Sequence, residues 1–234
     1  MTSKSKYLTL VCSTAAALLV LGTQSAMAAP GTITGSAHDF SSGGTNPYKG
    51  TNQQTCVYCH TPHGASTTAG VALWNRAETA SVFTPYASGT LNAAGGGQPG
   101  VVSKLCLSCH DGTIAVDSYG LGAYAVAGVN KIIGRANIGA DLSNDHPIGI
   151  TYNAALVALD PGLTNPATTN VTIGFAGTNT GTIAAKMLFG ASNATLECAS
   201  CHDVHNSASG TAVSSKLLRV SNVSSALCRV CHAK

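Results

Sequence analysis

The sequence predicts a mostly irregular fold with short α-helices, a few short β-strands and no large sheet. Small residues such as Gly and Ala are abundant, whereas only four Phe and one Trp are present to fill a core. Between residues 112 and 195, Thr, Val and Ile alternate and are repeatedly interrupted by Gly, Pro and Asn, which is typical of turns and short strands. One five-residue motif occurs four times at uneven spacing. A chain of this kind needs something other than large apolar side chains to organise it.

The first 28 residues have the layout of a secretory signal. Lys4 and Lys6 precede an apolar stretch over residues 8–22, and Ala26-Met27-Ala28 supplies small residues at a cleavage site. The apolar stretch is too short to cross a bilayer comfortably. We expect residues 1–28 to be removed and residues 29–234 to form the mature domain. An uncleaved membrane anchor is the alternative.

The charge of the chain excludes some classes of partner. The chain has 12 Lys and Arg against nine Asp and Glu, and loss of Lys4 and Lys6 brings the two nearly into balance. The basic residues form no cluster, so we expect no nucleic-acid partner. No later stretch is apolar enough to be an integral membrane segment.

All cysteines outside the predicted signal belong to one repeated motif. Of nine Cys, Cys12 lies in the predicted signal, and the other eight form four copies of Cys-x-x-Cys-His. These copies are Cys56-Val-Tyr-Cys59-His60, Cys106-Leu-Ser-Cys109-His110, Cys198-Ala-Ser-Cys201-His202 and Cys228-Arg-Val-Cys231-His232. No Cys of the mature chain lies outside these motifs, which indicates a single purpose for all eight.

This motif is typical of covalent haem attachment. The two thiols add to the two vinyl groups of a haem as thioethers, and the adjacent His becomes the proximal iron ligand. The sequence therefore predicts four haem c groups bound to the eight Cys, with His60, His110, His202 and His232 on the irons. Zinc sites and structural disulfides are the alternatives, but neither requires a His after every second Cys.

The remaining histidines match the number of irons. The mature chain has four more His, namely His38, His63, His146 and His205, and its only Met is Met187. One distal imidazole is therefore available for each iron. We expect bis-His ligation at all four irons.

The spacing of two of these histidines restricts which iron each can bind. His63 follows His60 by three residues, and His205 follows His202 by three, so on a helix each pair shares one face. The second His cannot then reach the far side of the haem that the first one binds. We expect the haems of the first and third motifs to exchange distal ligands.

His146 and His38 lie outside the motifs. Pro147 and Gly149 predict a turn after His146, which would return to the second haem, and Asp145 could orient its imidazole. His38 lies in a Gly- and Ser-rich segment near the new N-terminus, which is typical of a flexible arm. No His follows the fourth motif, so the last haem must take its distal ligand from upstream or from another molecule.

Few large side chains and four haems together predict a small haem-organised fold. Haem would supply the apolar surface that the chain lacks, so we expect the haem-free chain to remain unfolded. Short helices are expected next to each motif, including one over residues 212–225 before the last. Trp74 is expected to pack against a porphyrin or in an ordinary core.

The motif neighbourhoods resemble a known family. Cys56-Val-Tyr-Cys59-His60-Thr-Pro-His63, Cys106-Leu-Ser-Cys109-His110-Asp-Gly-Thr113 and Asp145-His146-Pro147-Ile148-Gly149 are similar to the doubled Cys-x-x-Cys-His multihaem c-type cytochromes. The motif count, chain length and N-terminal His resemble the OmcE-type extracellular tetrahaem cytochromes of metal-reducing bacteria. The resemblance implies polymerisation into a conductive nanowire filament. It also implies that His38 ligates the haem of Cys228, Cys231 and His232 in a neighbouring subunit.

These expectations lead to a function. An iron with two His ligands has no open site for a substrate, so outer-sphere electron transfer is expected and an enzymatic role is not. The expected partners are further copies of the chain, other multihaem cytochromes and extracellular electron acceptors. A monomeric periplasmic electron shuttle is the alternative, and a multihaem reductase, which needs an iron without a distal ligand, is a less favoured one.

Overall fold

The computed structural model describes residues 33–44, 46–67, 73–93, 96–174, 179–205 and 216–233. The predicted signal segment, residues 1–28, lies outside the described residues. Within the described ranges, no helix is long and apolar enough to cross a membrane.

Irregular backbone dominates, as the composition predicts. The longest helix of the described chain has ten residues. The α-helices are α1 (Val101–His110), α2 (Ala154–Leu159), α3 (Ile183–Met187), α4 (Cys198–Cys201) and α5 (Ala226–Cys231). Single 3-10 turns are η1 (Thr55–Tyr58), η2 (Gly122–Tyr124), η3 (Gly134–Ala136) and η4 (Val223–Ser225).

Two small antiparallel sheets contain the strands. β1 (Ile150–Thr151) pairs with β4 (Thr195–Leu196), with Ile150 opposite Leu196. β2 (Asn170–Ile173) pairs with β3 (Asn179–Thr182), with Val171 opposite Gly181. These short strands lie in or at the border of the span where alternating Thr, Val and Ile predicted them.

The helices occupy a different position from the one expected. We predicted helices next to the Cys-x-x-Cys-His motifs, but η1, α1, α4 and α5 contain motif residues themselves. Two residues between the cysteines close one helical turn, so the His N–H can donate to the carbonyl of the first Cys. This bond is 2.8 Å for His60, 3.1 Å for His202 and 3.0 Å for His232. In the expected helix over 212–225, the described part, 216–225, contains only the turn η4.

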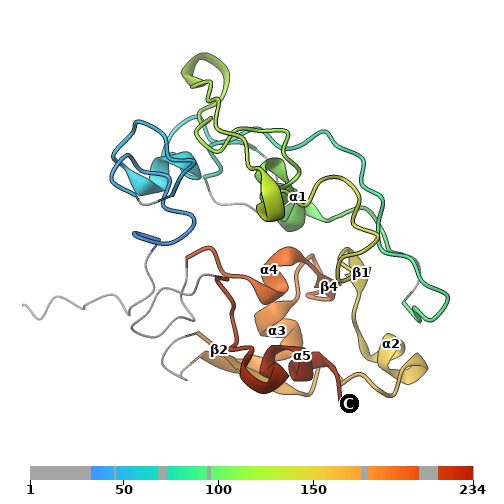
Figure 1. Ribbon diagram of the computed structural model, residues 1–234. Helices are drawn as coiled ribbons and strands as arrows, with labels where there is room; N and C mark the ends of the chain where they lie inside the picture. The colour runs from blue at the N-terminus through green and yellow to red at the C-terminus, as the bar shows by residue number, and fades with distance from the viewer. Residues whose placement is uncertain are drawn as a thin grey trace, which may run out of the picture.

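The chain forms two regions that meet along α1 and α4. Figure 1 shows most of residues 33–149, blue to yellow, above residues 150–233, yellow to red, with one green loop of the first part coming down beside the second. We call these the N-terminal region and the C-terminal region. Helix α1 of the first packs against α4 of the second. The first two motifs lie in one region and the last two in the other.

The C-terminal region has an apolar core, which the sparse large side chains did not predict. Nine buried side chains of this region pack together with Ala93: Ile150, Tyr152, Leu156, Val171, Ile173, Ile183, Met187, Leu188 and Leu196. The side chains of this region therefore supply an apolar interior of their own, whether or not haem adds to it. Short strands and single helical turns suffice because each contributes one or two inward side chains.

Candidate haem sites

Six of the eight histidines lie in pairs across the fold. The imidazole centres are 6.2 Å apart for His60 and His205 and 6.1 Å apart for His110 and His38. They are 6.4 Å apart for His232 and His146. Each pair joins the His of one Cys-x-x-Cys-His motif to a His outside the motifs, and all three pairs join residues more than 70 positions apart in the sequence.

The separations match two imidazoles on one metal. A metal–imidazole nitrogen bond is roughly 2 Å long and the ring centre lies roughly 1 Å beyond the nitrogen, so ring centres on opposite sides of one iron are roughly 6 Å apart. Ring centres at such distances also occur in ordinary aromatic packing. The identity of the partners is therefore the stronger observation, because every pair takes one proximal and one distal candidate.

Hydrogen bonds hold three of the rings with Nε2 available. Nδ1 of His110 lies 2.7 Å from the carbonyl of Ala136, and Nδ1 of His202 lies 2.8 Å from that of Lys216. In His146, Nδ1 lies 3.1 Å from the carbonyl of Pro147. Because a carbonyl oxygen only accepts, Nδ1 is the protonated nitrogen and Nε2 keeps its lone pair. A second-nitrogen bond of this kind is the usual way to orient a metal-ligating His.

His38 is buried in the N-terminal region. Burial, assisted by the nearby imidazoles of His110 and His202, lowers the pKa of His38 to about 4. The ring is therefore neutral at pH 7, which is the form that binds a metal. Its Nδ1 atom is buried and has no hydrogen-bond partner among the described residues.

The structure places the rings of His38 and His146 beside motif histidines other than those expected. His146 was expected to return to the second motif, but its ring lies beside His232 of the fourth. His38 was expected to reach a neighbouring subunit, but its ring lies beside His110 of its own chain. The physical reason is that residues 36–44 are held by hydrogen bonds, including those that Ser41 donates to Asp39, and do not extend as an arm. The hydrogen bond of the His146 ring goes to the carbonyl of Pro147 and not to Asp145.

An exchange of distal ligands between the first and third motifs would require two ring pairs, and one of them is present. His205, from the third motif segment, lies over His60 of the first with the ring planes 14° apart. The Asp203 carboxylate, 3.6 Å from Nδ1 of His205, raises the pKa of that imidazole. Among the described residues no ring pair joins His63 to His202, and both side chains are exposed. Met187, the alternative soft ligand, is buried in the apolar core.

All eight motif cysteines are free thiols, with no disulfide among the described residues. Burial raises the pKa of Cys59 to about 11, Arg76 opposes the rise and Cys109 adds to it, so the first and second motifs are neighbours. A hydrogen bond between Cys106 and Cys198 raises the pKa of Cys106 and lowers that of Cys198.

The third and fourth motifs are also neighbours. Burial raises the pKa of Cys201, and Cys198 and Cys228 raise it further. Burial likewise raises the pKa of Cys231 to about 11, with a contribution from Cys201. The thiols therefore form a series through the molecule in the order of the sequence, from the first motif to the fourth.

Three buried polar atoms of the described chain have no partner, and all lie near the first two motifs. They are Nδ1 of His38, Nε1 of Trp74 and Nε of Arg76. Trp74 packs edge-on against His60 at 6.4 Å, and the two backbones form a β-bridge. Buried polar atoms of folded proteins are nearly always satisfied. Their clustering here fits a group that completes the N-terminal region.

A bare metal ion has no comparable site. No group of three or more His, Cys, Asp or Glu among the described residues is arranged to hold one. A haem iron needs only two ligands from the protein, because the porphyrin supplies the other four. The donor set of free thiols and facing imidazoles therefore fits haem c.

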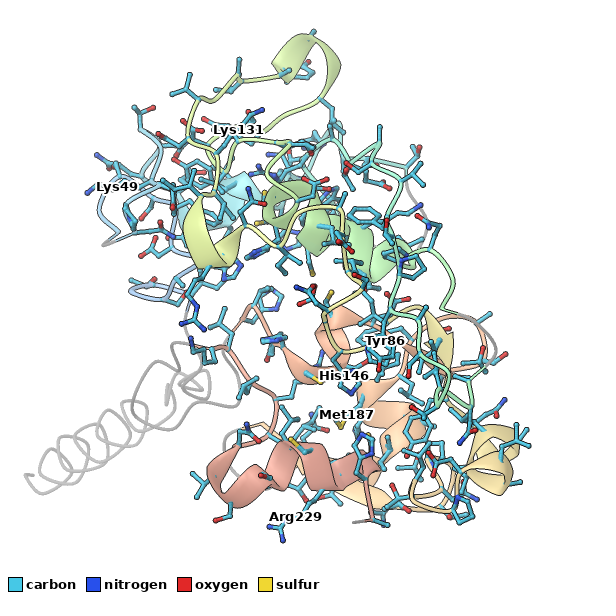
Figure 2. All side chains as sticks on the ribbon, turned by 45° about the vertical axis from the view of Figure 1, so that its right-hand side comes forward. Lys49, Tyr86, Lys131, His146, Met187 and Arg229 are labelled. Carbon is cyan, nitrogen blue, oxygen red and sulfur yellow. The ribbon has the colours of Figure 1, made fainter. Side chains whose placement is uncertain are left out.

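Sequence reasoning missed Arg76. Its guanidinium is buried, with 3 % of the residue exposed, between the first two motifs. A single Arg next to Trp74 carries no sequence signal of burial. In contrast, the side chains of Lys49 and Arg229 lie at the margins of the molecule (Figure 2).

No protein-family model matches the chain, and no curated protein is similar to it.

Proposed function

We propose that the chain is a tetrahaem c-type cytochrome that transfers electrons and is not an enzyme. The observation that carries this proposal is the set of three facing imidazole pairs, each with one motif His and one distal His. The resemblance of the motif neighbourhoods to multihaem c-type cytochromes supports the same conclusion. Export and an extracellular or cell-surface location follow from the predicted signal, with the periplasm as the alternative.

The haem iron supplies one-electron redox chemistry, and the chain's residues decide how that chemistry is used. The eight cysteines would hold the four groups covalently. Two imidazoles at an iron would leave no site there for a substrate, and three such pairs of imidazoles lie close together in the chain. The carbonyls of Ala136, Lys216 and Pro147 fix the rings of His110, His202 and His146. Such a site favours electron exchange over bond making.

The order of the cysteines supports a continuous path. Cys59 lies near Cys109, Cys106 near Cys198, and Cys201 near Cys228 and Cys231. Each motif thus has the next one in the sequence as a spatial neighbour. Electrons could pass through the four motifs from one end of the chain to the other.

The full chain, expressed with c-type haem maturation, tests the proposal. We expect four haems per chain by mass spectrometry. By electron paramagnetic resonance we expect low-spin ferric signals from the irons of His60, His110 and His232, and from the iron of His202 only where a second imidazole reaches it. In His205→Ala, the iron of His60 should lose its distal ligand and add one high-spin signal, whereas Asp145→Asn should leave the spectrum unchanged. Fewer than four haems would contradict the proposal, and high-spin signals from more than one iron of the unmodified protein would contradict it and favour a reductase.

Polymerisation into a conductive filament is a second candidate function. It is favoured by one observation: His63 and His202 are exposed and do not form a ring pair within the described chain. A neighbouring copy could bring His63 opposite His202 and continue the path from chain to chain. A head-to-tail contact that does not close gives an open filament. The candidate cross-chain ligand is then His63, in place of the His38 expected from the sequence.

Electron microscopy of His63→Ala and His38→Ala separates these assignments. We expect His63→Ala to abolish filaments and His38→Ala to leave them, since His38 pairs within its own chain. Unmodified protein that remains monomeric at all concentrations would support the shuttle alternative. Other multihaem cytochromes and extracellular acceptors are the redox partners that either form would serve.

A further inference from the structure

Arg76 occupies the junction between the first and second motifs. Nη1 donates to the carbonyls of Tyr58 and Val116, at 3.0 and 2.8 Å. Nη2 donates to the carbonyl of Ala115 at 2.5 Å and to Sγ of Cys109 at 3.3 Å. The residue directly after the bridge between His60 and Trp74 is Asn75, which anchors the segment through a backbone bond to Cys59 of 2.9 Å. The guanidinium is thus fixed against both motifs by four contacts.

No carboxylate forms an ion pair with Arg76 in the described part of the chain. The hydrogen-bond partners of Arg76 are three carbonyls and a sulfur, and the one ion pair found in the described ranges joins His205 and Asp203. The third nitrogen, Nε, is buried and has no partner there. Removing an ion from water without a counter-ion costs several kcal/mol. An apolar side chain would fill the same volume without that cost, so packing alone does not account for the residue.

The charge lies beside the sulfurs of both motifs. Nη2 is 3.3 Å from Sγ of Cys109, and Nη1 donates to the carbonyl of Tyr58, the residue directly before Cys59. Once haem is attached, the same sulfurs are thioethers at the edges of two neighbouring macrocycles. Reduction of a haem adds one negative charge, so a fixed cation beside it favours the reduced form.

We propose that the buried Arg76 guanidinium raises the reduction potential of the two haems attached at Cys56/Cys59 and Cys106/Cys109, an inference that rests on the proposed function. Arg76 holds a permanent charge at their junction and contacts the Cys109 sulfur directly. The guanidinium group of arginine stays charged in proteins, so this cation is a permanent one. The N-terminal haem pair then holds electrons more strongly than it would beside a neutral side chain.

Three variants of the haem-loaded full chain separate charge from packing. Arg76→Gln and Arg76→Met remove the charge, Arg76→Lys keeps it but loses the fork of donors, and Lys131→Gln removes an exposed cation as the control. Haem content is measured by mass spectrometry, midpoint potentials by spectroelectrochemical titration, and stability by thermal unfolding.

We expect the neutral variants to keep four haems and to shift two of the four redox transitions to lower potential. At a fixed solution potential, the ratio of reduced to oxidised haem should fall on the order of tenfold, which corresponds to about 59 mV for one electron. Arg76→Lys should be less stable to heat but should keep the potentials of the unmodified protein. Lys131→Gln should change neither.

Unchanged titration curves in a four-haem neutral variant would overturn the proposal. An Arg76→Lys shift as large as that of Arg76→Gln would also overturn it, because the effect would then come from lost hydrogen bonds. So would failure of both neutral variants to acquire four haems, which would make the role structural. Absence of haem from the unmodified protein would instead refute the proposed function itself.

Discussion

The two regions of the molecule are stabilised in different ways. The C-terminal region encloses one apolar cluster that includes Ile183, which is completely buried. The N-terminal region has two smaller clusters, around Tyr58 and around Leu107. It also contains ten of the twelve buried polar residues of the described chain and all three unsatisfied polar atoms. One region has a conventional interior, and the other has an interior that haem would complete.

Loss of haem should produce the largest difference in hydrogen-exchange protection between the two regions. If all eight motif cysteines are replaced by Ser, the N-terminal region loses the groups around which His38, Trp74 and Arg76 are arranged. We expect hydrogen exchange of its amides to approach that of an unfolded chain, while amides of α3 and of β2 and β3 stay protected by roughly tenfold or more. Equal loss of protection in both regions would show that the apolar cluster is not stable alone.

A cavity in the apolar cluster should destabilise the C-terminal region. Ile183→Ala removes three buried carbons from a residue with 0 % exposure, and we expect a loss of about 3 kcal/mol in the free energy of unfolding. Hydrogen exchange of α3 in the haem-loaded protein measures it. Val129→Ala, at a residue that is 85 % exposed, is the control and should change stability by less than about 0.5 kcal/mol.

Loss of a buried carboxylate should destabilise the N-terminal region. The Asp111 carboxylate accepts hydrogen bonds from the hydroxyls of Thr79, Ser81 and Thr113 and from the Thr113 amide. Asp111→Asn leaves only one acceptor oxygen, so we expect a loss of about 2 kcal/mol, measured by exchange of the amides in α1.

The matched control is Asp160→Asn in the C-terminal region. The Asp160 carboxylate accepts a hydrogen bond from the amide of Gly162. We expect a smaller effect there than at Asp111. If the two variants lose equal stability, the N-terminal region does not depend specifically on its buried polar network.

The smallest expected effect is at the start of α2. The Asn153 side chain accepts from the Leu156 amide at 3.0 Å and caps the helix. Asn153→Ala should cost about 1 kcal/mol, whereas Asn153→Asp should cost much less because Asp caps equally well. Local exchange at α2 distinguishes them. Equal losses in both variants would mean that the cap contributes little to this short helix.

The sequence predicted which residues belong to the candidate sites better than it predicted which of these residues lie together. Four Cys-x-x-Cys-His motifs and four further histidines predict eight ligands from residue types and spacing alone. The partner of each ligand could not be predicted, because it depends on how loops without periodicity fold. His205 was matched to the first motif because the spacing from His202 excludes its own haem. His38 and His146 have no such restriction, and their expected partners were exchanged.

In the fold, too, the short strands could be predicted from the sequence and the packing could not. Broken alternation between residues 112 and 195 predicted short strands, and the structure contains them there. The apolar cluster was not predicted because its members, such as Leu156 and Met187, come from separate single turns with no shared period. The burial of Arg76 depends on carbonyls of Ala115 and Val116, some 40 residues away, which no local pattern reveals.

A density map of the haem-loaded chain tests the ligand assignment most directly, because it shows which two imidazoles flank each iron. The account predicts His60 with His205, His110 with His38, and His232 with His146, all within one chain. An iron of the first, second or fourth motif with any other distal ligand, or with none, would contradict it.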